Sequence, residues 1–144
     1  MKRWLAMLVA VALVSGCGGM KTKQRVSSLD ETLNAYRILL RWGQYEDALR
    51  YIRFREPKPE DELPKLDLDA LKPVKLASYD VVRKVMTPEE DKADIEVAIT
   101  YYHEESNVLH SMRQTQHWWF DEESERWFLD GEFPDLIGNL RKDR

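Results

Sequence analysis

Residues 94–101 read DIEVAITY, and the alternation of polar and apolar residues in this stretch decides the class of the fold. Ile95, Val97, Ile99 and Tyr101 fall on one face of an extended strand, and the residues between them fall on the other. A strand that is apolar on one face only is typical of an antiparallel sheet that covers a core on one side. The sequence therefore predicts such a sheet in the second half of the chain.

The segment just before this strand supplies a partner for a hairpin. It alternates in the same way and ends in an acidic turn that contains a proline. A loop of about five residues sets Val81 opposite Val97 and Tyr79 opposite Ile99, so that both apolar faces coincide. The same register places Arg83 on the inner face, where its charge is unexplained.

Two further strands follow. Polar turns at residues 104–107 and 121–125 delimit strands at 108–120 and 126–133. Together with the first hairpin they predict an antiparallel meander of about four strands. Strands this long twist and curl, so the sheet is expected to be curved with a concave face.

The chain before the sheet has helical periodicity. Ser28 matches a helix-capping pattern, a second short helix is expected from residue 44, and residues 56–73 form a proline-rich loop with one helical turn near 68–71. Helices grouped before an antiparallel sheet define an α+β domain, with the helices packed on the sheet. The residues expected on the buried face of the first helix are Leu29, Leu33, Tyr36 and Leu40.

The start of the chain has the pattern of a signal peptide: a basic beginning, then an apolar run at residues 5–14. Val14-Ser15-Gly16-Cys17 follows, which resembles the lipobox of bacterial lipoproteins. The resemblance implies cleavage after Gly16, a diacylglyceryl thioether on Cys17 and an acyl group on its new amine. No other cofactor is expected.

We therefore divide the chain into a signal peptide at 1–16, the lipidated cysteine with a flexible tether at 17–28, and a single α+β domain at 29–140. Two or more acyl chains hold a protein stably at a bilayer. Gly18, where an Asp would favour retention in the inner membrane, favours the outer membrane over the inner, with the domain facing the periplasm. The net charge of −4 argues against nucleic-acid binding.

The order of elements, together with the segments WWFD at 118–121 and RWFLDG at 126–131, is similar to the NTF2-like (cystatin-like, cone-shaped α+β) superfamily. That resemblance implies a pocket between the helices and the sheet. The candidate lining residues on the inner face are Tyr79, Tyr101 and His103. The resemblance implies no reaction, because this fold hosts enzymes, transport factors and dimerisation modules.

The aromatic group Trp118, Trp119, Trp127 and Phe128 is the densest in the chain. Consecutive bulky residues on a strand point to both faces, so some of them point away from the core. The functional interpretation is an exposed aromatic surface for an envelope protein partner or for a second copy in a homodimer. The alternative is that the C-terminal segment 133–140 covers the outer rings.

The sequence contains few motifs that indicate catalysis or metal binding. The sequence has no Gly-rich phosphate loop, no G-x-S-x-G and no H-E-x-x-H motif, and Cys17 is assigned to lipid, so an enzyme is the less favoured class. If His103 and His110 face each other across a hairpin they could bind a divalent metal. The alternative is two half-exposed histidines of a sheet.

Three hypotheses therefore remain. The leading one is a non-catalytic, lipid-anchored module for protein interaction or self-association. The second is a pocket that binds, or converts, a small apolar ligand, and the third is metal binding by the two histidines.

Overall fold

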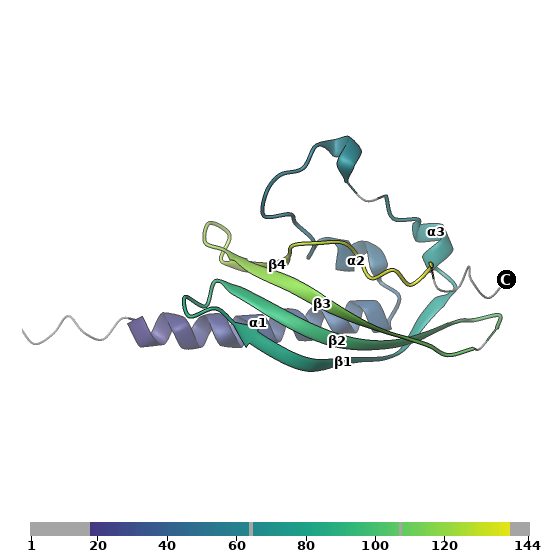
Figure 1. The fold of residues 1–144 in the computed structure, drawn as a ribbon, viewed down its shortest axis with the longest axis horizontal. Coiled ribbons are helices and arrows are strands. Elements are labelled where there is room, and N and C mark those ends of the chain that lie inside the picture. The colour runs from purple at the N-terminus through teal and green to yellow at the C-terminus, as the bar shows by residue number, and fades with distance from the viewer. Residues whose placement is uncertain (1–17, 64, 107, 139–144) are drawn as a thin grey trace, which may run out of the picture.

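The computed structural model describes residues 18–63, 65–106 and 108–138. The predicted signal peptide at 1–16, with Gly16, and the predicted lipidation site Cys17 lie outside these residues. The described chain is an α+β fold with its helices before an antiparallel sheet of four strands, as the sequence predicts (Figure 1). Its elements are α1 (Gly18–Arg41), α2 (Tyr45–Leu49), a 3-10 turn η1 (Glu60–Glu62), α3 (Leu68–Leu71), β1 (Val74–Met86), β2 (Lys92–His103), β3 (His110–Asp121) and β4 (Arg126–Leu129).

The sheet is a meander in which the strands lie in the order β1-β2-β3-β4, each antiparallel to the next. Helix α1 lies along one face of this sheet (Figure 1). The apolar face of α1 is buried there against the inner residues of β2, which form one core cluster with it. The members of that interface predicted from periodicity are all buried: Leu29, Leu33, Tyr36, Leu40, Ile95, Val97, Ile99 and Tyr101.

The β1–β2 hairpin has the predicted register. Val81 lies opposite Val97, and Tyr79 lies opposite Ile99. Tyr79 is only 2% exposed, whereas Val81 is 45% exposed. Both residues border a cleft between this edge strand and α1, but the Tyr79 side chain is covered because its ring packs edge-on against Tyr36 and its hydroxyl donates to Gln116.

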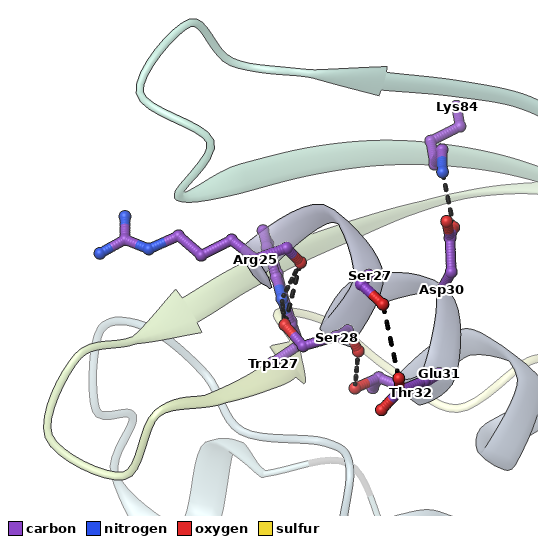
Figure 2. Close-up of polar contacts among 8 residues, drawn as sticks. All are labelled: Arg25, Ser27, Ser28, Asp30, Glu31, Thr32, Lys84 and Trp127. Atoms are coloured by element: carbon purple, nitrogen blue, oxygen red, sulfur yellow. Dashed lines mark hydrogen bonds and ion pairs between the residues drawn. The ribbon is translucent and has the colours of Figure 1, made fainter. Parts of the chain in front are cut away.

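A β-bulge in β1 explains why Arg83, which the sequence predicts on the inner face of the sheet, does not lie there. The pairing shifts by one residue between Val81 and Arg83, so Arg83 lies opposite Glu96 on the outer face and is exposed. The next residue, Lys84, then points toward α1, and its Nζ lies 2.5 Å from the Asp30 carboxylate (Figure 2). The inner-face position predicted for Arg83 is therefore wrong, because the extra residue of the bulge exchanges the two faces.

Helix α1 begins at Gly18 and not at Ser28, so the prediction of a flexible tether is wrong for the described part of that segment. The residues between are mostly strong helix formers. They also have partners: the Trp127 indole N–H donates to the Ser28 hydroxyl at 3.1 Å and to the Arg25 carbonyl at 3.3 Å (Figure 2). Arg25 also forms an ion pair with Glu122. The folded domain thus includes the residues from Arg25 onward.

The chain after α2 extends the sheet. Helix α2 ends at Leu49, earlier than its apolar face suggests, and the chain then runs parallel to β4. The Leu129 N–H donates to the Tyr51 carbonyl at 2.7 Å, and the Arg53 N–H donates to the Leu129 carbonyl at 3.0 Å. The edge of β4 is therefore paired. None of the helices among the described residues is long and apolar enough to cross a membrane.

Candidate functional site

The aromatic group expected to form an exposed surface is mostly buried. Trp118 and Trp127 are each 1% exposed and Phe128 is 3% exposed, while Trp119 is half-buried. Trp118 and Trp127 face the core under α1, and Phe128 lies on the other face under the Arg53 guanidinium, 3.9 Å from its ring centre. The exposed aromatic surface predicted from the sequence is therefore wrong for these three residues.

Aromatic rings also occupy the space where the family resemblance placed a pocket. The Tyr36 ring packs edge-on against the rings of Tyr51, Tyr79 and Trp118, with centroids 5.5–6.3 Å apart. The Tyr79 hydroxyl donates to the Gln116 side chain at 2.8 Å. Burial raises the pKa of Tyr36 and Tyr79 above the ordinary value for tyrosine. These buried hydroxyls are held in their neutral form at physiological pH.

The three residues predicted to line a common pocket are not brought together. Tyr79 borders a cleft of about 300 Å³ between α1 and β1. Tyr101 is fully buried in the core, and it does not line that cleft. His103 lies at the end of β2, where its Nδ1 accepts a hydrogen bond from the Glu105 backbone N–H at 3.3 Å.

The two histidines proposed as metal ligands do not face each other. The register of β2 and β3 places His110 opposite Tyr101, with ring centroids 5.7 Å apart, and His103 lies opposite Val74 of β1 instead. The predicted pairing fails because the register differs by two residues: pairing His103 with His110 needs a turn centred on Ser106-Asn107, whereas the observed pairs are centred between Glu105 and Ser106. Within the described residues, no group of three or more His, Cys, Asp or Glu side chains is placed to hold a metal ion.

A further candidate site is a groove that the sequence did not indicate. It has a volume of about 790 Å³ and lies between the segment that follows α2, helix α3 and residues 131–137 after β4. These segments lie together above the sheet in the view of Figure 1. Pockets for small molecules typically measure about 300–1,000 Å³ and are lined mainly by apolar side chains. The partly exposed apolar side chains of the wall are Leu49, Ile52, Phe54, Leu63, Leu66 and Ile137.

Charged side chains border this apolar wall. The cations are Arg53, Arg55, Lys58 and Lys65, and the acids are Glu132 and Asp135. Arg53 and Lys58 are engaged by the protein. The Arg53 guanidinium lies 3.3 Å from the Asp121 carboxylate, and the Lys58 ammonium lies 4.2 Å from the centre of the Phe54 ring.

Nearly all the polar side chains that line the groove are these charged ones. The one other polar side chain among the described lining residues is Trp119, whose indole N–H already donates to the Arg53 carbonyl at 2.9 Å. No Ser, Thr, Cys, His or Tyr lines the groove in the described chain.

Comparisons of this chain with protein-family models, with curated proteins and with solved structures found no match.

Proposed function

We propose that this chain is a lipid-anchored cell-envelope protein whose domain binds an apolar ligand in the groove between α2, α3 and residues 131–137. One observation carries the binding role: a groove of about 790 Å³ whose wall consists of apolar side chains left partly exposed. The lipobox-like sequence at 14–17 supports the anchor on Cys17, and Gly18 supports the outer membrane. Helices that precede an antiparallel meander support an NTF2-like cone.

The wall favours binding because apolar side chains that remain exposed in a folded domain gain from being covered. Covering them is worth about 25 cal/mol for each Å² of apolar surface removed from water. Large apolar hollows on a folded domain commonly mark a ligand or partner site. The groove is therefore a better candidate than the sheet aromatics, which already lie within the fold.

The same wall favours binding over catalysis. Nucleophilic and acid-base catalysis relies on Ser, Cys, His, Tyr, Lys or a carboxylate held close to a partner. The described lining offers no hydroxyl, thiol or imidazole, and its lysines and carboxylates are all exposed: Lys58, Lys65, Glu132 and Asp135. A binding protein is the function that this set of side chains supports best.

The test is a titration of the chain from residue 18 onward with N-phenyl-1-naphthylamine, a neutral apolar dye whose fluorescence rises on binding. Gly131 borders the groove, and a Cβ there would meet no heavy atom within 4 Å, so the backbone has room for the Cβ of a larger residue at this position. We expect saturable binding that Gly131→Ala retains and Gly131→Phe strongly weakens. Absence of saturable binding, or equal affinity in the two folded variants, would contradict the proposal.

Self-association is a second candidate, supported by the edge strand β1. Val81, Val82 and Val85 are 45–49% exposed on this strand. An edge strand with exposed apolar residues can pair with the same strand of a second copy, although bulges such as those of β1 oppose pairing. Native mass spectrometry of the wild type and of Val82→Lys tests this: a dimer lost in the variant supports it, and a wild-type monomer at high concentration contradicts it.

A further inference from the structure

We propose that the ligand of the groove is an anionic amphiphile: a single alkyl chain that ends in a carboxylate or a phosphate, with this head group bound by Arg55 and Lys65. This inference rests on the binding role proposed above and adds the chemical class of the ligand. It is carried by the contrast between an apolar wall with one uncharged polar side chain, Trp119, and two cations beside it that have no acidic partner among the described residues.

The apolar wall of the groove favours a ligand with a hydrocarbon tail. A peptide or a sugar brings several uncharged donors and acceptors, and each one buried without a partner costs about 1–3 kcal/mol. Beyond its charged groups, the described lining offers one polar side chain, Trp119, and its N–H is already used by the Arg53 carbonyl. A hydrocarbon chain needs no such partner, so it fits this wall without that penalty.

The unpaired cations beside the groove favour a ligand with an anionic head group. Arg53 is held by Asp121, and Lys58 is held over the ring of Phe54. The side chains of Arg55 and Lys65 make no hydrogen bond or ion pair with any part of the chain that the structure describes. Two exposed cations at the edge of an apolar groove can both donate to one anionic head, and such charge-assisted hydrogen bonds are stronger than neutral ones.

The acids of the rim do not cancel this preference. Asp135 accepts a hydrogen bond from the Gly138 N–H at 2.7 Å, so part of its acceptor capacity is used within its own segment. Glu132 is exposed, and with Arg53 paired to Asp121, three cations still border the groove against these two acids. The chain as a whole carries a net charge of −4, so this cationic rim is a local departure from its composition.

The experiment displaces the bound dye with four ligands that share a twelve-carbon chain: dodecanoate, dodecyl phosphate, dodecan-1-ol and dodecylamine, each below its micelle concentration. We expect at least one anion to bind about tenfold more tightly than the alcohol at neutral pH, and the amine to bind no better than the alcohol. The two anions distinguish a fatty acid from a phosphate-bearing lipid. Lowering the pH until dodecanoate is protonated should remove its advantage.

The variant Arg55→Gln/Lys65→Gln should bring the anion down to the affinity of the alcohol while the alcohol itself binds as before. Arg50→Gln is the matched control, because Arg50 is an exposed arginine outside the groove that pairs with Asp47. Equal affinities for anion and alcohol in the wild type, or preference for the amine, would overturn this inference and leave the binding role intact. Failure of the dye and of all four ligands to bind would instead overturn the binding role.

Discussion

Removing the hydroxyl of Tyr36 should stabilise the protein. The side chain is 0% exposed, and its oxygen has no hydrogen-bond partner among the described residues. An unpaired buried polar group costs about 1–3 kcal/mol. Tyr36→Phe deletes this oxygen and keeps the ring, so the edge-on contacts with Tyr51, Tyr79 and Trp118 remain. We expect the free energy of unfolding to rise by about 1–3 kcal/mol.

The assay is urea denaturation followed by circular dichroism, in which a higher midpoint at unchanged slope reports a gain in stability. Tyr79→Phe is the control, because it removes a hydroxyl 2% exposed that does have a partner, the Gln116 side chain at 2.8 Å. That variant should lose about 0.5–1.5 kcal/mol. If Tyr36→Phe also loses about 1 kcal/mol or more, the Tyr36 hydroxyl is paired in the folded protein and the reasoning fails.

Three further predictions concern the fold. Gly43 has a φ of +68°, so Gly43→Ala should lower the free energy of unfolding by about 1–2 kcal/mol in the same urea assay, and an unchanged midpoint would argue against this backbone conformation. Trp127→Phe removes the indole N–H that binds α1 and should cost about 1–3 kcal/mol, with faster amide exchange at the start of α1; exchange unchanged there would show that this contact does not hold the helix. Burial raises the pKa of Tyr45 to about 12 and those of Tyr36 and Tyr79 above 10, so the folded state keeps protons that the unfolded state loses, and stability should fall above about pH 10 by about 1.4 kcal/mol per pH unit for each tyrosine. Tyrosinate absorbance should therefore appear for Tyr36 and Tyr79 only as the protein unfolds and for Tyr45 only near pH 12 or on unfolding, and titration of these residues near pH 10 in the folded state would contradict the burial.

The register of the first hairpin could be predicted because period-two alternation leaves one pairing that matches both apolar faces. The bulge at Val82 could not, since an inserted residue changes which face each later side chain occupies and leaves no signature in composition. Arg83 was the one sign of it, as a charge on an apolar face. The partner of His110 cannot be predicted for a related reason: the centre of the second turn sets the register, and the polar residues there allow more than one centre.

The start of α1 and the fate of the aromatic group depend on contacts between distant parts of the chain. Ser28 matches a capping pattern, but Trp127 binds its hydroxyl from a position 99 residues further on. Phe128 points away from the core and is nevertheless buried, because the chain after α2 returns to place Arg53 over its ring. Local sequence patterns carry no information on contacts between segments that are far apart in the chain.

The groove is the clearest case of a site that sequence reasoning misses. Leu49, Leu66 and Ile137 reach it from three segments that have no common period or motif, and the proline-rich loop between α2 and α3 looked like a simple connection. The one usable signal was that this loop holds apolar residues such as Phe54 and Leu63 among its charges, where a loop that is only a spacer would have little use for them.

The early start of α1 fixes how far the domain can stand from its proposed anchor. Arg25 lies seven positions after Gly18, and this stretch spans about 10 Å as a helix, less than half of its extended reach. The full helix of 24 residues is about 36 Å long, and α2, which lines the groove, begins just after it ends. With Cys17 acylated, the length of α1 would set the distance between the lipid and the groove, so inserting a helical turn next to the exposed Lys23 and Gln24 would increase that distance.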